Sequence, residues 1–217
     1  MKKILITQSN YIPWKGYFDA INSVNDFVIY DDAQFTKGDW RNRNRIKTSH
    51  GTQWITIPVN MKNRLSKKIN EIKISDENWS KKHWNIVKIN YSSAPYFKYY
   101  QSFFEELYMN CNEQYLSMIN FRWSSEFDLK GDRSEKLLNI CLDLKASEYY
   151  SGPAAKDYLN TSLFKTRNMK ISWINYDGYR EYDQLYPPFE HAVSIIDLIF
   201  NTGPEIKKYL KGFAESA

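Results

Sequence analysis

The sequence is poor in the residues that mark proteins stabilised by disulfides or metals. Its 217 residues include only two cysteines, eight glycines and seven prolines. Cys111 and Cys141 lie far apart, and neither has a histidine or cysteine at metal-ligand spacing, so no disulfide framework or metal site is predicted. The hydrophobic fraction of 42% and the charged fraction of 25% are ordinary for a globular protein, which excludes disordered, collagen-like and coiled-coil chains.

Long hydrophobic runs are also lacking. The apolar stretch 193–200 is interrupted by Asp197 and is far shorter than the roughly 20 residues of a membrane-spanning helix. The first ten residues hold two lysines and only a short apolar run, too short for the core of a signal peptide. The sequence therefore predicts a cytoplasmic protein with no membrane span.

Charge of one sign is not in large excess, whereas aromatic residues are abundant. The 30 basic and 25 acidic residues leave a net charge of +5, a modest value that does not favour nucleic acid as the partner. The chain contains 17 Tyr, 12 Phe and 7 Trp. Such residues can line a site for a sugar or nucleobase, but general burial trends favour a large aromatic core.

Apolar periodicity predicts an α/β fold in one domain over residues 1–217, with a parallel-sheet core and helical elaboration in the C-terminal half. The first strand, helix and second strand fit a right-handed parallel βαβ unit. Strands are expected over 3–7, 26–30, 41–47, 53–59, 69–74, 147–150 and 169–176. Helices are expected over 17–24, 79–91, 96–109, 114–123, 133–144, 153–159, 193–200 and 204–210.

The first candidate site follows the first predicted strand and opens the first predicted helix, where ligands of parallel sheets commonly bind. Lys15 could meet a phosphate at the helix start, and Gly16 would let a ligand approach the backbone. Trp14 and Tyr11 could stack on a ring. The alternative is a structural turn with Trp14 in the core. The candidate ligand-binding residues here are Gln8, Tyr11, Trp14, Lys15, Gly16 and Tyr17.

The second candidate is a pair of carboxylates, Asp31 and Asp32, at the end of the second predicted strand. Adjacent residues of a strand point to opposite faces, so only one is expected to serve a site. That carboxylate could bind a divalent metal with a nucleotide, accept sugar hydroxyls or act as a base. An ordinary turn-capping pair is the equal alternative. With Lys15 they are the catalytic candidates, and Gln34 is a nearby substrate-binding candidate.

The third candidate is an alternation of arginines after Trp40. Arg41, Arg43 and Arg45, followed by Lys47, would project from one face of an extended strand. Neighbouring like charges destabilise a strand pair unless an anion neutralises them, and the arginine fork suits phosphate. The pattern thus indicates a phosphate-bearing ligand. A solvated basic edge that discourages aggregation is the equal alternative.

The fourth candidate is the small-residue turn at Gly152, which leads into a predicted helix carrying Lys156. A second phosphate or carboxylate site could form there, although the residues alone favour a plain connection between strand and helix. The three histidines form no readable catalytic constellation.

The chain resembles the WbqC-like family in several segments that keep their order and spacing. They are QSNYIPWKGYF (8–18), FVIYDDAQF (27–35), WRNRNRIK (40–47), Tyr91 with APYF (94–97), YYSGPAAKDYL (149–159) and SIIDLIFNTGP (194–204). Ser9 departs from the family pattern, which usually has proline there. The resemblance implies a role in gene clusters for bacterial surface polysaccharide, especially O-antigen, and a suggested activity as a glycine transferase acting on an amino sugar.

A fainter similarity covers residues 4–35, which resemble the start of pantothenate synthetase and other nucleotidyl-transfer folds. That resemblance implies a nucleotidyl-transfer-like βαβ unit and activation of a carboxylate by ATP with Mg²⁺. Tyr17 stands where one of the two histidines of that fold belongs. A tyrosine cannot offer the positive charge of an imidazolium to a phosphate. This departure argues against acyl adenylation on this chain and leaves two alternatives open: the acyl donor arrives already activated, or ATP with Mg²⁺ activates the acyl group here. The cofactor is therefore not assigned.

Together these features indicate a surface-polysaccharide enzyme that transfers an acyl or aminoacyl group to a nucleotide-linked amino sugar or other phosphate-bearing small molecule. Two alternatives stay open. The arginine alternation and the aromatics would suit a module that stacks on single-stranded nucleic acid. The absence of a readable catalytic constellation would also suit a non-catalytic partner in a biosynthetic complex.

Overall fold

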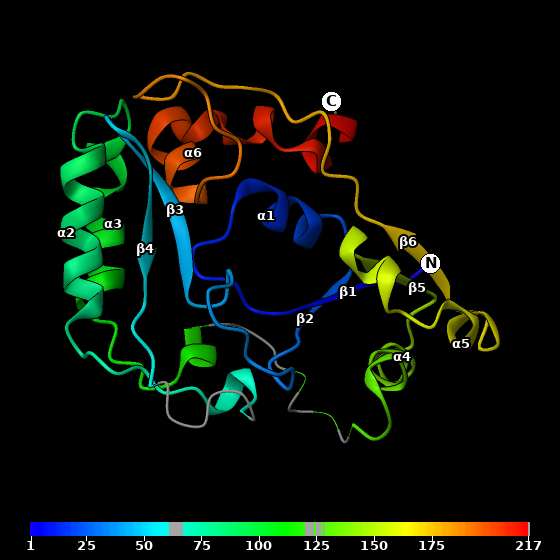
Figure 1. Cartoon of the computed structure of the whole chain (residues 1–217). Coiled ribbons are helices and arrows are strands. Elements are labelled where there is room, and N and C mark those ends of the chain that lie inside the picture. The colour runs from blue at the N-terminus through cyan, green and yellow to red at the C-terminus, as the bar shows by residue number, and fades with distance from the viewer. Residues whose placement is uncertain (61–66, 120–123, 125–126, 128, 217) are drawn as a thin grey trace. The chain divides into compact units, whose positions relative to one another are not determined.

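The computed structural model describes residues 1–60, 67–119, 124, 127 and 129–216 (Figure 1). The chain forms two compact units, neither of which is continuous in sequence. The sheet unit comprises Met1–Ser9, Ala20–Ala33 and Asn120–Asp177, and the hairpin unit comprises Asn10–Asp19, Gln34–Ile119 and Gly178–Ala217. The single domain expected over residues 1–217 stays a prediction.

The sheet unit holds a four-stranded parallel sheet in the order β2-β1-β5-β6, which confirms the α/β fold class. The strands are β1 (Lys3–Thr7), β2 (Asp26–Ile29), β5 (Glu148–Ser151) and β6 (Lys170–Trp173). Central β1 is an apolar run because neighbouring strands and the packing on both faces bury it. Its Leu5 pairs with Phe27 of β2 and Tyr150 of β5.

Short and medium helices complete the sheet unit. They are α4 (Arg133–Asp143), α5 (Thr161–Lys165) and a 3₁₀ helix over Pro153–Asp157, and α1 (Lys15–Asn22) contributes its last residues. Leu5, Ala20 and Ile174 form a buried apolar cluster in this unit. The expected parallel βαβ pairing is confirmed, because β1 and β2 are parallel neighbours joined through α1.

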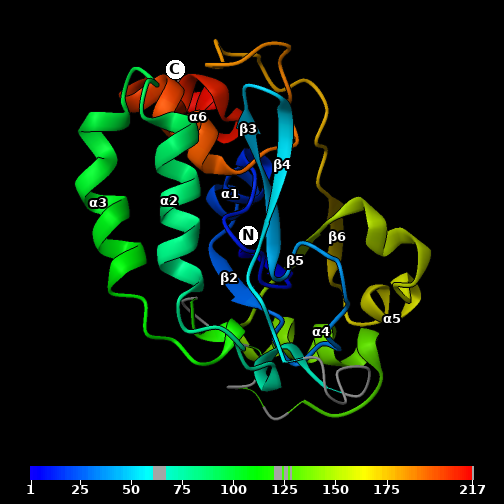
Figure 2. The same ribbon diagram turned by 60° about the vertical axis from the view of Figure 1, so that its left-hand side comes forward.

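The hairpin unit is built on an antiparallel pair with long helices beside it (Figure 2). Its elements are β3 (Arg43–Thr48), β4 (Gly51–Thr56), α2 (Trp79–Tyr91), α3 (Phe97–Met109), α6 (Ile195–Thr202) and 3₁₀ helices over Ile69–Glu71, Leu116–Ile119, Gly203–Tyr209 and Lys211–Ser216. Trp84, Tyr91, Phe97 and Phe200 are almost fully buried. Much of the aromatic surplus is therefore core.

Several expected elements differ from the structure. The strand expected over 69–74 is wrong. Ile69 and Ile72 are both fully buried, and their spacing of three residues is that of the 3₁₀ helix found there. The predictions also missed α5, whose five residues are too few to show a period. The helix expected over 114–123 is a 3₁₀ turn at 116–119, and residues 120–123 lie outside the described part. No helix among the described residues has the length and apolarity needed to cross a bilayer.

Candidate ligand site

A pocket of about 210 Å³ opens in the hairpin unit, between the loop that precedes α1 and the start of β3. It is lined by Asn10, Pro13, Trp14, Trp40, Asn44 and Ala192. Asn44 is buried on β3, and its Nδ2 donates hydrogen bonds of 2.9 Å to the carbonyls of Tyr11 and Ile12. The N–H of Tyr11 donates to the carbonyl of Trp40 at 3.0 Å. These bonds fix the loop that precedes α1 to β3 and to Trp40, so that the walls of the pocket are held together.

The glycine at position 16 has a packing role. A Cβ on Gly16 would lie 2.3 Å from the indole of Trp14, a distance that real Cβ atoms do not tolerate. The same indole contacts the ring of Tyr179 edge-on at 5.5 Å between centroids. The space above Gly16, expected to receive a ligand, is therefore filled by Trp14, whose side chain forms part of the pocket wall.

Arginines and indoles share one face of the β hairpin. The guanidinium of Arg43 stacks 4.1 Å above the ring of Trp54, and that of Arg45 lies 5.8 Å from the ring centroid of Trp40. Trp40 and Trp54 contact each other at 5.0 Å and are 37% and 41% exposed. Stacking of this kind holds planar guanidinium groups in place. Arg41 contacts the pocket directly, because it donates a hydrogen bond to Oδ1 of Asn10.

Two of these arginines keep hydrogen-bonding capacity. Within the described part of the chain, the buried Nε atoms of Arg43 and Arg45 have no acceptor. Lys47, expected on the same face as a fourth cation, is instead buried at the end of β3. Its Nζ donates to the carbonyl of Pro188, and its backbone N–H donates to the hydroxyl of Tyr91. The basic face of the hairpin is thus made of arginines alone.

Lys15 begins α1, but its side chain does not reach solvent. It is 3% exposed, and its Nζ donates to the carbonyl of Arg180 at 2.9 Å. The rings of Tyr179, Tyr182 and Phe189 surround the ammonium with centroids 5.1 to 5.5 Å away. Burial lowers the pKa of Lys15 to about 8. The amine is therefore partly neutral just above neutral pH.

Tyr11 lies in a buried polar group rather than on the pocket surface. Its hydroxyl makes hydrogen bonds with Nδ1 of His83 at 2.8 Å and with the hydroxyl of Tyr108 at 2.9 Å. Burial raises the pKa of Tyr11 and lowers that of His83 to about 4, so both groups are neutral at neutral pH. Tyr17 is half-buried, and Gln34 is exposed.

A buried carboxylate was missed as a site feature by the sequence reasoning. Asp197 is fully buried in α6 and accepts hydrogen bonds from Tyr91 at 2.9 Å, Tyr182 at 2.7 Å and Gln184 at 2.8 Å. Burial raises its pKa despite these donors. The signal in the sequence is a single acidic residue within an apolar stretch. Because buried polar groups are hydrogen-bonded, such a residue predicts donors nearby, but the sequence does not show which residues they are.

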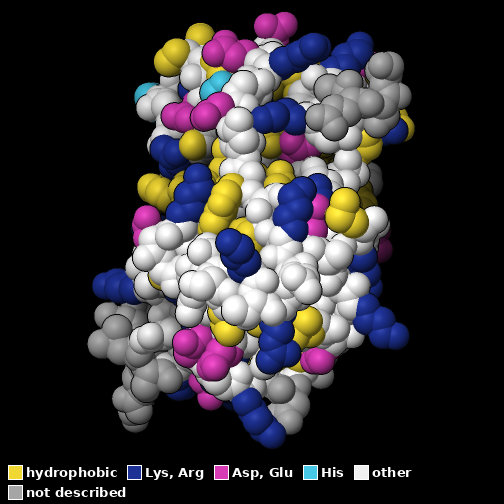
Figure 3. All heavy atoms as spheres, turned by 90° about the vertical axis from the view of Figure 1, so that its right-hand side faces the viewer, with side chains coloured by type: hydrophobic (Ala, Val, Ile, Leu, Met, Phe, Trp, Pro, Cys, Tyr) yellow, Lys and Arg dark blue, Asp and Glu magenta, His cyan; other side chains and the backbone are white. Residues whose placement is uncertain are grey.

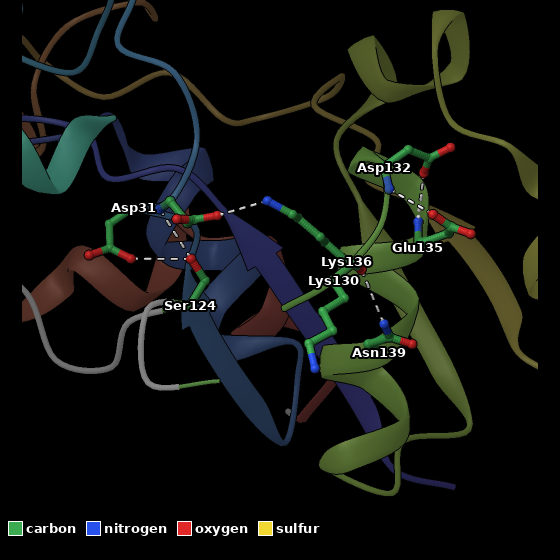
Figure 4. A network of polar contacts seen from close by, with 8 residues as sticks. Asp31, Ser124, Lys130, Asp132, Glu135, Lys136 and Asn139 are labelled. Atoms are coloured by element: carbon green, nitrogen blue, oxygen red, sulfur yellow. Dashed lines mark hydrogen bonds and ion pairs between the residues drawn. The ribbon is translucent and has the colours of Figure 1, made fainter. Parts of the chain in front are cut away.

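In the sheet unit, the two adjacent carboxylates after β2 have different partners, and Figure 4 shows Asp31 beside Ser124. Asp31 is 2% exposed and accepts a hydrogen bond of 3.1 Å from the hydroxyl of Ser124. Asp32 is half-buried and forms an ion pair with Lys136 of α4 at 3.1 Å. The nearby Tyr30 has a raised pKa, mainly through burial. In the described part of the chain, no three His, Cys, Asp or Glu side chains are placed to hold a metal ion.

Two other candidate residues follow neighbouring strands of the same sheet. The pairing of Lys3 with Glu148 places Gln8, after β1, beside the end of β5, where Gly152 stands. The strand order changes direction between β1 and β5, and ligands of open α/β sheets bind at such a point. Lys156 is exposed, with its Nζ 5.5 Å from the ring centroid of Trp173.

The predicted residues thus divide between the units. In the hairpin unit, Trp14 and Trp40 line the pocket, Arg41 and Arg45 contact residues of its lining, and Arg43 stacks on Trp54. The same unit buries Tyr11, Lys15 and Gly16. The sheet unit holds Gln8, Asp31, Asp32, Gly152 and Lys156 near the carboxyl ends of its strands.

Comparison with known proteins agrees with the resemblance of the sequence motifs. A relative from Mycobacterium tuberculosis (strain ATCC 25618 / H37Rv), named "Uncharacterized protein Rv1507c", is 44% identical over 227 residues, covering 97% of this chain and 98% of the relative. No solved structure matches the chain. The model of the WbqC-like protein family matches residues 8–209, which include the pocket and both groups of candidate residues, and the chain therefore belongs to that family.

Proposed function

We propose that the chain is an enzyme of bacterial surface-polysaccharide assembly that binds a nucleotide-linked amino sugar and transfers an acyl or aminoacyl group, such as glycine, to its amine. One observation carries the proposal: a pocket walled by two indoles adjoins a row of arginines in the hairpin unit. Membership of the WbqC-like family supports the role in polysaccharide assembly.

The pocket suits a flat or cyclic group with polar edges. Its volume of about 210 Å³ and its walls of Trp14 and Trp40 fit one sugar ring or one nucleobase. Asn10 and Asn44 supply the polar side of the lining. Indoles contribute apolar area, and the side-chain amide of Asn10 would fix the orientation of a hydroxyl or amide group. The amide N–H groups of Asn44 hold the pocket wall instead, because they donate to the carbonyls of Tyr11 and Ile12. We assign this pocket to the ring of the sugar nucleotide.

The arginines would hold the phosphates. Arg43 and Arg45 occupy adjacent positions on one face of β3, roughly 7 Å apart along the strand. Their guanidinium groups can therefore reach neighbouring phosphates of a diphosphate. Arg43 and Arg45 are each half-buried, and the outer N–H groups of their guanidinium groups would donate to phosphate oxygens in charge-assisted hydrogen bonds, which are stronger than bonds to neutral acceptors.

Amide formation needs a base for the amine proton and donors that polarise the carbonyl. The amine nitrogen attacks the acyl carbon, its proton passes to the base, and the activating group of the donor departs. Asp31, Asp32 and Lys15 stay the catalytic candidates. Tyr17 cannot offer the positive charge with which an imidazolium would stabilise a phosphate during activation of the acyl group. We therefore favour a donor whose acyl group is already activated when it binds.

The test measures binding of nucleotide-linked amino sugars by the shift in melting temperature and by calorimetry. A ligand present at 100 times its Kd stabilises the folded chain by about 2.7 kcal/mol. The double variant R43Q/R45Q should weaken binding by at least about ten-fold, since each lost charge-assisted bond contributes more than 1.4 kcal/mol. R167Q, which removes an exposed arginine of the sheet unit, is the matched control. No shift with any nucleotide-linked amino sugar would refute the proposal.

Transfer is tested separately, with an activated glycine donor and the sugar that binds most tightly. D31N and D32N should each bind the sugar as the parent does, and the variant of the catalytic base should lose transfer. K15M is compared for stability and sugar affinity as well as transfer, because Lys15 is enclosed by protein groups beside the loop that carries Trp14. Full transfer by all three variants would leave binding intact and exclude these residues as catalysts. Binding with no transfer by the parent chain would favour the non-catalytic partner in a complex.

One observation favours a second function, binding of single-stranded nucleic acid. The exposed rings of Trp40 and Trp54 alternate with arginines, as on surfaces that stack bases. Figure 3 shows another face, on which Lys and Arg side chains lie among Asp and Glu side chains, so the described atoms there form no continuous basic surface. Tight oligonucleotide binding with a steep salt dependence would support this function. Its absence at low salt would exclude it.

A further inference from the structure

Trp54 of β4 is an exposed indole that has no part in the binding of sugar and phosphates proposed above. Tryptophan side chains are highly buried on average, yet 41% of Trp54 is exposed. Among the described residues, the ring does not belong to the pocket lining. Trp54 pairs with Arg45 in the register of the hairpin, and directly opposed residues of an antiparallel pair share one face. The exposed ring therefore lies on the face that carries the arginines.

Two arginines of β3 hold this ring in place. The guanidinium carbon of Arg43 lies 4.1 Å from the ring centroid of Trp54, and that of Arg45 lies 5.7 Å from it. Arg43 is itself anchored, because its Nη2 donates a hydrogen bond to the carbonyl of Gly38. Cation–π contacts of this kind restrain an indole while part of its surface stays open to solvent. A flat ligand would thus meet a ring that is already in place, which lowers the entropy cost of binding.

Arg45 contacts two indoles at once. Its guanidinium carbon is 5.8 Å from the ring centroid of Trp40 and 5.7 Å from that of Trp54, and the two rings contact each other with centroids 5.0 Å apart. Trp40 lines the pocket and Trp54 does not. The cation thus stands where the pocket wall adjoins a second, exposed indole. A sugar nucleotide presents matching parts in the same order: a sugar ring, a diphosphate, and a flat base carried by ribose.

We propose that the exposed ring of Trp54 is the surface on which the base of the sugar nucleotide stacks. The inference rests on the proposed function, in which the pocket takes the sugar ring and the arginines take the diphosphate. Every base offers a π face to an indole, so stacking recognises the presence of a base more than the groups at its edge. Binding of the base then separates nucleotide-linked sugars from sugars on carriers that lack a base, such as a lipid diphosphate.

The test compares two ligands of equal charge that differ only in the base, by calorimetry on the full chain. One is the nucleotide-linked amino sugar that binds most tightly, and the other joins the same sugar through the same diphosphate to a methyl riboside. The parent should bind the complete ligand about 5- to 100-fold more tightly, the range that base–aromatic stacking supplies. W54L removes the ring and should bring the two affinities to within about two-fold of each other. Equal affinities in the parent, or a ratio that W54L leaves unchanged, would overturn the inference.

Further variants separate stacking from a merely structural role of the ring. A ring that only positioned Arg43 would change the affinity for both ligands equally, so the ratio would persist in W54L. W54F keeps a smaller ring and should restore part of the preference for the base. A W54F chain with no such preference would contradict stacking. Y99L, which removes an exposed ring of α3, is the matched control and should leave both affinities unchanged.

Failure of this inference is distinguishable from failure of the proposed function. If both ligands bind the parent equally well, the sugar and phosphate contacts stand and the base contact falls. If no nucleotide-linked amino sugar binds, adenosine diphosphate and ribose 5-diphosphate replace the two ligands, because this pair needs only the arginines and the ring of Trp54. A preference for adenosine diphosphate that W54L abolishes would then keep the base contact. Equal affinity, or binding of neither, would overturn it.

Discussion

The buried Lys15 predicts a specific dependence of stability on pH. In the folded chain its pKa is about 8, mainly because burial removes water from the ammonium. In the unfolded chain a lysine titrates near 10.4. Between these values the unfolded chain binds more protons than the folded chain, so the free energy of unfolding should rise with pH. The cost of burying the charge is fully present below pH 8 and is relieved above it.

The magnitude follows from the two pKa values. Each unit of pKa difference corresponds to about 1.4 kcal/mol, but only part of the difference is released below pH 10. Between pH 7 and pH 9.5, the titration of Lys15 should add about 2 kcal/mol to the free energy of unfolding. Above that range the tyrosines of the unfolded chain begin to ionise, which would act in the opposite direction.

Urea denaturation of the parent and K15M at pH 7, 8, 9 and 9.5 measures this effect. Methionine keeps an unbranched apolar chain between the rings of Tyr179, Tyr182 and Phe189 but cannot titrate. Subtracting the two profiles cancels the titration of all other groups that do not interact with position 15. The difference should change by about 2 kcal/mol in favour of the parent as pH rises. If the difference in the free energy of unfolding between parent and K15M stays constant with pH, nearby acidic groups such as Asp197 keep the ammonium charged in the folded chain. That result would refute the argument from burial. K156M, at an exposed lysine, supplies the baseline for the loss of one lysine.

Two further sets of substitutions test local geometry. Gly203 has a φ of 53°, and a Cβ there would lie 2.3 Å from the ring of Tyr96, whereas Gly51 has a φ of 104° with no atom within 4 Å. G51A should therefore lower the free energy of unfolding by about 1–2 kcal/mol through backbone strain. G203A should lower it by about 3 kcal/mol or more, because the clash with the ring adds to the strain. Equal losses in urea denaturation would exclude the clash as a cause. At α4, Asp132 and Glu135 form a capping box, so D132A should lose about 1 kcal/mol in thermal denaturation. D132N should keep most of that stability, and a D132A chain as stable as the parent would contradict the cap.

The regular elements could be predicted where the burial pattern and the apolar pattern coincide. The strand over 3–7 and the helix over 79–91 agree with the structure at both ends. The strand is a continuous apolar run because both of its faces are buried, whereas the helix shows the helical period because one face of it is buried. The strand expected over 69–74 failed because only Ile72 and Ile74 alternate with a polar residue. Ile69 and Ile72 are three residues apart, which is the spacing of the 3₁₀ helix found there.

Side-chain roles were harder to predict than elements, because they depend on partners far along the chain. Tyr11 is held by His83 and Tyr108, which lie 72 and 97 residues away in sequence, and Lys15 by a carbonyl 165 residues away. A motif read by itself shows polar and aromatic residues at a strand end, and any of them could face a ligand. Only the distant segments decide which residues are buried.

The segment 8–17 therefore combines two kinds of residue that one motif cannot distinguish. Trp14 lines the pocket, so its loss should weaken ligand binding while the fold persists. Tyr11 and Lys15 are enclosed by protein groups, so changes there act first on stability and on the position of the loop that carries Trp14. A loss of activity at Tyr11 or Lys15 alone cannot identify a catalytic group. The distinction requires that stability and ligand affinity be measured on the same variants, since only a residue that contacts the ligand changes affinity at constant stability.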